Sequence, residues 1–486
     1  MSLTINNAAL FQQHAFINGQ WCDAETGDRF DVTNPSTLEK IADVPNLGVE
    51  ETTAAIDAAD QALPAWRALT AKERSARLRA WYELIMANQE DLAKLMTSEQ
   101  GKPLAEARGE VAYGASFIEW FAEEAKRVYG DVIPAHGPDK RIVTLKQPIG
   151  VVAAITPWNF PIAMITRKAG PALAAGCTVV VKPGEHTPLS ALALAELSRQ
   201  AGIPAGVFNV VTTLKSPVVG KVLCNDSRVR KLSFTGSTPV GKLLMRQCAD
   251  TVKKVSLELG GNAPFIVFDD ADLDAAVAGV MASKFRNAGQ TCVCTNRILV
   301  QDGVHDRFVE KLNQAVAKLT LGDGFGEGVT TGPLINASAV AKVERLVGDA
   351  LAAGAELNQP SGKGELNDNF YAPAVLTGVT TDMVIANEEI FGPVATVFRF
   401  SDENEAVRIA NDTPFGLAAY FYARDIGRVW RVAEALEYGM VGINEGLIST
   451  EVAPFGGIKE SGIGREGSRY GIEDFVEIKY LCMGGI

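Results

Sequence analysis

Two short stretches of the sequence offer residues that could attack a carbonyl carbon and then release the product. Residues 287–294 read Asn-Ala-Gly-Gln-Thr-Cys-Val-Cys, and residues 257–262 place Glu258 one residue before a pair of glycines. A thiol attacks as the thiolate, and water needs a base before it can hydrolyse a thioester. Most free cysteines are small core residues, but the glycine and polar residues before Cys292, and the nearby thiol of Cys294, favour a reactive cysteine. We therefore predict that Cys292 is a nucleophile and Glu258 a general base.

The elements around these residues follow an alternating strand and helix pattern. Continuous apolar runs of strand length occupy residues 149–155, 178–183, 207–211 and 231–235, and helical patterns separate them. Strands that are apolar throughout indicate a parallel sheet covered on both faces, which is typical of dinucleotide-binding domains. A second α/β region follows to about residue 457. We predict an α/β protein with three parts: residues 1–127 with 149–260, residues 261–457, and an extended arm and tail formed by residues 128–148 and 458–486.

The extended runs of the third part lie far apart in the sequence. Residues 128–147 alternate as an exposed strand does, and residues 476–480 form a second extended run near the C-terminus. We expect the first run to reach outside its domain. The second run could then pair with the arm of another subunit.

Length and charge narrow the classes of protein to consider. At 486 residues the chain exceeds what one hydrophobic core holds, which indicates two or three domains. The content of 47% hydrophobic and 21% charged residues is typical of a globular enzyme. The net charge of −12 argues against nucleic acid as a partner. An anionic substrate would need arginines of its own within the site.

The cysteines and the N-terminal residues point to a cytoplasmic protein. The seven cysteines are scattered and form no CxxC pair, which argues against a disulfide framework and against a zinc site. No basic segment followed by an apolar core begins the chain, so no export signal is visible. Residues 147–166 are uncharged over about the length of a membrane span, but they contain three prolines and favour strand, turn and helix instead. We expect no membrane segment and no metal.

A cofactor motif must be separated from a false match. Residues 462–467 fit G-x-G-x-x-G, but no clear strand precedes them and no βαβ unit follows, so we reject this match. Residues 234–241 follow a strand and open a helix, where backbone amides and the hydroxyl of Ser237 can hold a pyrophosphate. An ordinary helix cap explains the same residues equally well.

Asn159 lies where the first parallel strand ends. Ligands of parallel sheets bind at the carboxyl ends of the strands, and an asparagine amide there could donate to an oxyanion together with the backbone N–H of Cys292. The alternative is a turn asparagine beside proline. None of the four histidines is near these motifs, which disfavours a Cys–His hydrolase.

Taken together, these motifs resemble a known family. Glu258-Leu-Gly-Gly and residues 285–292, Phe-Arg-Asn-Ala-Gly-Gln-Thr-Cys, closely resemble the glutamate and cysteine signatures of NAD(P)-dependent aldehyde dehydrogenases. The resemblance covers about residues 10–482 and is closest to the succinate-semialdehyde and glutarate-semialdehyde branch. It implies a Rossmann-type cofactor domain, an α/β catalytic domain, a small oligomerisation arm, and a homodimer or homotetramer.

The resemblance also assigns roles to individual residues. It makes Asn159 the oxyanion donor and implies that the cofactor contacts are Ile155, Thr156, Trp158, Lys182, Glu185, Ser237, Glu389 and Phe391. Glu185 can accept hydrogen bonds from both ribose hydroxyls and would repel a 2′-phosphate. We therefore expect NAD to be preferred, with NADP possible because some relatives carry a small polar residue at this position.

A further group of residues relates to the substrate. In the branch that this chain resembles, Arg167, Arg286 and Ser449 bind the distal carboxylate of a small semialdehyde, and two arginines suit a carboxylate well. Each arginine could instead form an ordinary ion pair, and Thr450 replaces Ser449 if the register slips by one. The resemblance further implies a reversible bridge between Cys292 and Cys294 as a redox switch. It assigns a proton relay to Lys168 and Glu466.

The predicted reaction is the oxidation of succinate semialdehyde to succinate with reduction of NAD(P). It passes through a thiohemiacetal and a thioester on Cys292. The alternatives are a glutarate-semialdehyde dehydrogenase, a general aliphatic aldehyde dehydrogenase and a cysteine acyltransferase or hydrolase without redox chemistry. A non-enzymatic binding or structural protein is disfavoured because Cys292, Glu258 and Asn159 are all present.

Overall fold

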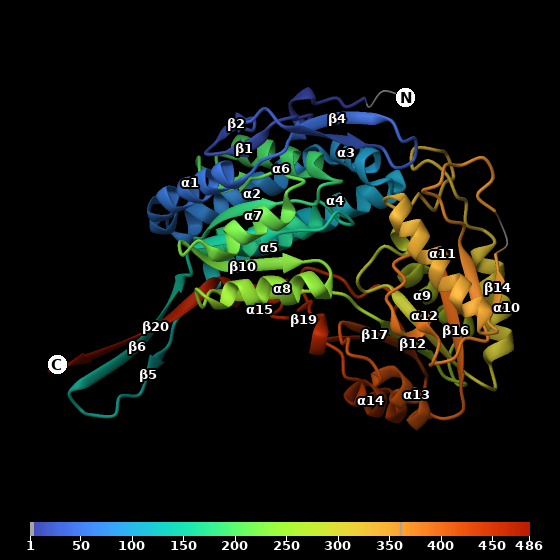
Figure 1. The fold of residues 1–486 in the computed structure, drawn as a ribbon. Coiled ribbons are helices and arrows are strands. Elements are labelled where there is room, and N and C mark those ends of the chain that lie inside the picture. Colours follow the sequence, from blue (N-terminus) through green and yellow to red (C-terminus); the bar gives the residue numbers. More distant parts are fainter. Residues whose placement is uncertain (1–3, 360–361) are drawn as a thin grey trace.

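Two large β-sheets organise the body of the molecule, and a third sheet forms an arm that projects from it (Figure 1). The computed structural model describes residues 4–359 and 362–486. The predicted α/β class is confirmed.

The first sheet has eight strands within the described residues, and its central five strands run parallel. Its order is β19 (Gly462–Ile463), β11 (Lys254–Glu258), β10 (Val229–Thr235), β7 (Val151–Ile155), β8 (Thr178–Lys182), β9 (Phe208–Val210), β1 (Ala15–Ile17) and β2 (Gln20–Cys22). Every residue of β7 and β8 is buried, because helices cover both faces of the sheet. The four apolar runs of the sequence are therefore parallel strands, as predicted.

The helices around this sheet carry much of the first core. They are α1 (Val49–Ala68), α2 (Ala71–Ala87), α3 (Gln89–Gln100), α4 (Leu104–Glu124), α5 (Ala163–Ala175), α6 (Pro188–Gln200), α7 (Ser216–Asn225), α8 (Thr238–Ala249) and the single turn α15 (Ser468–Gly471). Helix α5 packs against α4. It ends at Gly176, whose φ of +101° is the left-handed conformation that glycine adopts without steric cost.

The second sheet has seven strands within the described part of the chain. Its order is β14 (Glu356–Asn358), β15 (Ala374–Thr377), β16 (Val394–Phe400), β13 (Thr295–Gln301), β12 (Ala263–Val267), β17 (Ala418–Tyr422) and β18 (Met440–Ile443). The helices of this half are α9 (Leu273–Lys284), α10 (His305–Val316), α11 (Ala337–Ala352), α12 (Val384–Asn387), α13 (Glu403–Asn411) and α14 (Ile426–Ala435). The polar composition of residues 360–369 predicts a surface loop, and this segment lies partly outside the described residues.

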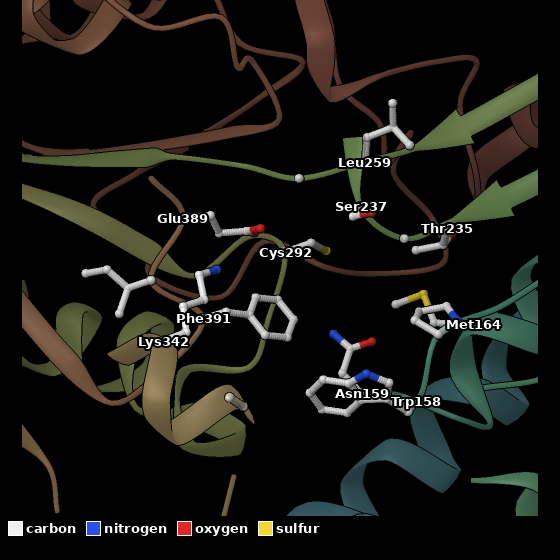
Figure 2. A pocket seen from close by; sticks show the side chains of 15 residues that line it. Trp158, Asn159, Met164, Thr235, Ser237, Leu259, Cys292, Lys342, Glu389 and Phe391 are labelled. Carbon is white, nitrogen blue, oxygen red and sulfur yellow. The ribbon is translucent and has the colours of Figure 1, made fainter. Parts of the chain in front are cut away.

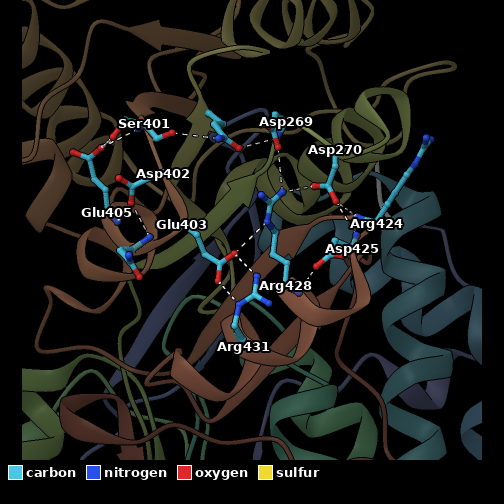
Figure 3. Close-up of polar contacts among 12 residues, drawn as sticks. Asp269, Asp270, Ser401, Asp402, Glu403, Glu405, Arg424, Asp425, Arg428 and Arg431 are labelled. Carbon is cyan, nitrogen blue, oxygen red and sulfur yellow. Dashed lines mark hydrogen bonds and ion pairs between the residues drawn. The ribbon is translucent and has the colours of Figure 1, made fainter.

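A cluster of ion pairs attaches α13 and α14 to the end of β12 (Figure 3). Arg428 contacts Asp269 at 3.1 Å, Asp270 at 2.7 Å and Glu403 at 3.2 Å. Its guanidinium also lies 4.6 Å from the ring centre of Phe268. One cation thus joins three segments on the side of this half that is far from the predicted site residues.

The arm consists of β5 (Val132–Ile133), β6 (Lys140–Pro148) and β20 (Val476–Gly484), and the C-terminus lies at its tip (Figure 1). Strand β20 pairs antiparallel with β6 of the same chain over their full lengths. The expectation that the tail pairs with the arm of another subunit is therefore wrong, since β6 and the tail satisfy each other's backbone groups within one chain. A separate hairpin, β3 (Arg29–Thr33) with β4 (Lys40–Pro45), lies near the N-terminus.

The segment 458–486, which the sequence grouped with the arm, divides in the structure. Strand β19 pairs with β11 at the edge of the first sheet, and Ile472 and Phe475 belong to the core of that half. Only the residues of β20 extend into the arm. Among the described residues, no helix is both long and apolar enough to cross a membrane.

Candidate active site

Cys292 lies where two cavities meet. The larger cavity is drawn in Figure 2, and the smaller lies beside it. Cys292 and Met164 line both cavities. A thiol in this position can react with a molecule held on one side while a second molecule lies on the other.

The loop that carries Cys292 is held in an unusual backbone conformation. Asn287 and Ala288 both have positive φ values, 52° and 55°. The side-chain amide of Asn287 donates to the carbonyl of Gln290 at 3.2 Å, which closes the turn just before Cys292. Gly261 passes so close that a Cβ there would lie 2.5 Å from the carbonyl oxygen of Cys292. The second glycine after Glu258 therefore permits the close approach of the two segments that carry Glu258 and Cys292.

Asn159 follows β7 and reaches the same loop. Its Nδ2 donates to the carbonyl of Gln290 at 3.0 Å, and its Oδ1 has no hydrogen-bond partner among residues 4–359 and 362–486. The side chain lines the larger cavity beside Cys292 (Figure 2). One amide hydrogen remains to donate to the oxyanion that would form on a carbonyl oxygen when the Cys292 sulfur attacks the carbonyl carbon.

Glu258 and Cys292 have strongly perturbed acidities. Glu258 ends β11, is buried, and has one carboxylate oxygen without a partner in the described chain. Burial, and then the charge of Glu466, raises the pKa of Glu258 well above its usual range. Burial also raises the pKa of the Cys292 thiol to about 12, and the charge of Arg167 partly opposes this. Burial thus favours the protonated form of both groups, and each must lose its proton to act.

Arg167 and Lys168, neighbours on α5, share one buried carboxylate. Arg167 Nε lies 2.6 Å from Glu466 Oε2, and Lys168 Nζ contacts Glu466 Oε1 and donates to Thr235 at 2.7 Å. Burial alone would raise the pKa of Glu466, but Lys168 and Arg167 outweigh it and lower that pKa. The structure therefore brings together the predicted relay residues, and it adds Arg167 to them.

The smaller cavity collects all three residues predicted to bind a carboxylate. Arg167, Arg286 and Ser449 line it with Cys292. Arg286 stacks over the ring of Phe160, 4.8 Å from its centre, and makes no ion pair within the described residues. Thr450 instead donates to Glu451 at 3.2 Å, which favours Ser449 over the shifted register.

Two aromatic residues of this cavity besides Phe160 were also not predicted. Tyr113 on α4 and Phe455 line it, and the guanidinium of Arg167 lies 3.9 Å from the ring centre of Phe455. Burial raises the pKa of Tyr113, so its hydroxyl stays protonated. No signal in the sequence separates these two side chains from ordinary core aromatics.

The larger cavity collects half of the predicted cofactor residues. Trp158, Ser237, Glu389 and Phe391 line it (Figure 2), and the rings of Trp158 and Phe391 meet edge to face at 5.8 Å. Ser237 precedes the first residue of α8, as predicted. Burial raises the pKa of Glu389 to about 7. Lys342 of α11 also lines this cavity and was not predicted.

The other four predicted cofactor residues lie at the carboxyl ends of neighbouring parallel strands. Ile155 ends β7, the backbone N–H of Thr156 donates to the carbonyl of Lys182 at 3.0 Å, and Lys182 Nζ lies 3.4 Å from Glu185 Oε2. None of the four is among the residues that line the larger cavity. The hydroxyl of Thr156 is buried without a partner in the described region. A polar edge of this kind, next to the N-terminus of α8, fits a dinucleotide.

Cys294 faces away from both cavities. It is buried, its Sγ contacts the carbonyl oxygens of Lys284 and Thr295 at 3.5 Å each, and both Cys292 and Cys294 are free thiols. A bridge between them would require Cys294 to turn, so the redox switch stays a prediction. The described residues contain no cluster of His, Cys, Asp or Glu that could hold a metal ion.

Comparison with known proteins gives concordant matches. The model of the aldehyde dehydrogenase family matches residues 21–481. Succinate-semialdehyde dehydrogenase [NADP(+)] from Escherichia coli is 65% identical over 99% of this chain and all of its own. Glutarate-semialdehyde dehydrogenase from Pseudomonas putida is 66% identical over the same shares. A crystal structure of an E. coli NADP-dependent enzyme superposes with a TM-score of 0.98 at 65% identity, covering 99% of this chain and all of that one.

Proposed function

This chain belongs to the aldehyde dehydrogenase family, and on that premise we propose that it oxidises a small aldehyde with a distal carboxylate. Succinate semialdehyde is the first candidate and glutarate semialdehyde the second. The observation that carries this proposal is the cavity beside Cys292 with two arginines in its wall. The names of the E. coli and P. putida relatives support both substrates.

The chemistry begins on the side of the smaller cavity. The thiolate of Cys292 attacks the aldehyde carbon, and the amide of Asn159 with the N–H of Cys292 stabilises the oxyanion of the thiohemiacetal. A nicotinamide dinucleotide in the larger cavity supplies the hydride acceptor. What remains on Cys292 is a thioester of the dicarboxylic acid.

Hydrolysis of the thioester needs a base. Glu258 takes a proton from water, the hydroxide attacks the thioester carbon, and the bond to Cys292 breaks. Lys168 and Glu466 are the residues that we propose to pass the proton toward solvent. The charge of Glu466 raises the pKa of Glu258, which supports a coupled set of groups. One aldehyde, one water and one oxidised dinucleotide give one acid, one reduced dinucleotide and one proton besides that of the acid.

For the cofactor we propose a preference for NAD. The pKa of Glu185 is lowered because the charge of Lys182 and hydrogen bonding outweigh the effect of its burial, so the carboxylate is charged at neutral pH. A fixed negative charge beside the ribose would repel a 2′-phosphate. The name of the E. coli relative, an NADP(+) enzyme, favours the other outcome.

For assembly and location we propose a cytoplasmic homodimer or homotetramer. The outer edge of β20 has no neighbouring strand in the described chain, and Ile478 and Tyr480 on it are 67% and 57% exposed. An open strand edge with apolar side chains favours association. The free thiols fit a reducing compartment. Light scattering after size-exclusion chromatography tests the assembly, and a monomer would refute it.

The test of function is a set of initial rates at 340 nm. Succinate semialdehyde, glutarate semialdehyde and propanal are each assayed with NAD and with NADP. We expect both acids to exceed propanal in kcat/KM by at least tenfold, and Cys292→Ala to abolish the signal. The extra methylene of glutarate semialdehyde is worth about 1–3 kcal/mol in either direction. Equal rates with propanal would refute the carboxylate site, and faster reduction of NADP would refute the role of Glu185.

A further inference from the structure

A buried ion pair lies next to Asn159, the predicted oxyanion donor. Lys102, in the turn between α3 and α4, contacts Glu110 on α4, and both side chains are fully buried. Burying two charges is costly, and a packed apolar pair would often be at least as stable. The pair therefore calls for an explanation other than stability of the core.

The lysine end of the pair holds the backbone of Asn159. Lys102 Nζ donates to the carbonyl oxygen of Asn159 at 2.8 Å, and Asn287 Nδ2 donates to the same oxygen at 3.0 Å. Asn287 also donates to the carbonyl of Gln290, which accepts the side-chain amide of Asn159. These hydrogen bonds hold the main chain of Asn159 through its carbonyl oxygen, and its side chain is hydrogen-bonded to the loop that carries Cys292.

The glutamate end holds the start of α5. Glu110 Oε1 accepts from the backbone N–H groups of Ile162 at 3.0 Å and Ala163 at 3.3 Å. Both groups belong to the beginning of the helix that bears Arg167 and Lys168. A single ion pair therefore contacts both ends of the turn after Asn159, through the carbonyl of Asn159 and the N–H groups at the start of α5.

We propose that Lys102 and Glu110 are positioning residues that set the distance between the Asn159 amide and Cys292 Sγ. The inference rests on the proposed role of Asn159 as the oxyanion donor. Displacing such a donor by about 1 Å can reduce the rate of the chemical step about 100-fold. Neither residue touches a reacting atom, so the effect passes through Asn159.

The variant to test is the double substitution Lys102→Met with Glu110→Gln. It removes the donor to Asn159, retains an acceptor for the start of α5, and removes both charges of the pair. The matched control is Glu99→Gln. Glu99 is also a buried carboxylate, and it accepts from Leu189 at 2.7 Å and Ser190 at 2.8 Å at the start of α6, with no hydrogen bond to Asn159 in the described chain. The Glu99→Gln variant measures how far neutralising a buried carboxylate at the start of a helix lowers the rate in general.

The measurement is the single-turnover rate of reduced dinucleotide formation, in the wild-type and in the Asn159→Ala background. In the wild-type background we expect the double substitution to lower the single-turnover rate at least tenfold and to change KM less than threefold. In the Asn159→Ala background we expect the factor by which the rate falls to be at least three times smaller. Glu99→Gln should lower the single-turnover rate less than twofold. A loss that differs by less than threefold between the two backgrounds overturns the proposal, because a merely structural defect would act equally in both.

Two provisions keep the outcome decisive. The aldehyde is the one that wild-type enzyme oxidises fastest, so inactivity with semialdehydes refutes the proposed substrate without bearing on Lys102. If the double variant is unfolded at the assay temperature, the same cycle is run with Glu110→Gln alone, under the same criterion.

Discussion

Substitution of Arg286 by methionine should separate carboxylated from neutral aldehydes. Arg286 lines the cavity beside Cys292, and its guanidinium has no ion-pair partner in the described chain. Arg167 on the same wall is already paired with Glu466 at 2.6 Å. Arg286 is therefore the cation with free hydrogen-bonding capacity for a substrate carboxylate, and methionine keeps much of its apolar stem.

The size of the effect follows from the interaction removed. A hydrogen bond to a charged group contributes about 1.5–3 kcal/mol, which corresponds to about a 10- to 150-fold change in kcat/KM. We expect this loss for succinate semialdehyde, mainly in KM, because the carboxylate is bound in the ground state as well as in the transition state. Propanal should change less than threefold.

The assay compares kcat/KM for the two aldehydes in the wild type, Arg286→Met and a surface control. Arg408→Met is that control, since Arg408 is 67% exposed in its side chain and lies on α13 of the second half. It makes the same change in net charge without touching the cavity. An equal loss for propanal, or no loss for succinate semialdehyde, would refute the carboxylate-binding role of Arg286.

Three further substitutions address hydrolysis, cofactor choice and stability. Glu258→Gln should give one rapid equivalent of reduced dinucleotide per active site and then slow turnover. In the wild type the raised pKa of Glu258 means that its base form, and so the hydrolysis rate, grows as pH rises through that pKa, and stopped-flow absorbance should show this limb missing in the variant. Glu185→Ser should lower KM for NADP at least about tenfold, because the repulsion of the 2′-phosphate is removed. An unchanged ratio of the NAD rate to the NADP rate would contradict this expectation. Arg428→Met should lower the free energy of unfolding by about 1–2 kcal/mol, and so lower Tm by a few degrees in calorimetry without changing kcat. A fall in kcat would show that the ion-pair cluster affects the active site.

Much of the site could be predicted because of a property of parallel sheets. The carboxyl ends of parallel strands lie at one edge, so residues that follow successive strands meet there. Asn159 follows β7, Glu185 follows β8, Ser237 follows β10 and Glu258 ends β11. Apolar runs in the sequence located β7, β8 and β10, and the turns after them located one shared edge, whereas β11 was not predicted and Glu258 was found from its motif.

Contacts between distant segments could not be predicted in this way. Nothing local in the sequence indicates that the tail pairs with β6 of its own chain, since both runs are simply extended. Lys102 and Glu110 read as ordinary charged residues of a helical region. Their importance depends on complete burial and on a contact with Asn159, 57 residues away from Lys102.

The pairing of Arg167 with Glu466 illustrates the same limit and changes how the site is understood. By resemblance, Arg167 was assigned to the substrate and Glu466 to proton transfer. Successive helix residues point about 100° apart, so Arg167 and Lys168 can reach the two oxygens of one carboxylate from the same helix turn. Because that carboxylate influences the pKa of Glu258, the wall of the proposed substrate cavity and the proposed hydrolytic base are electrostatically connected through one buried group. Replacing Arg167 would therefore disturb binding and hydrolysis together, and Arg286 is the position at which carboxylate recognition can be tested alone.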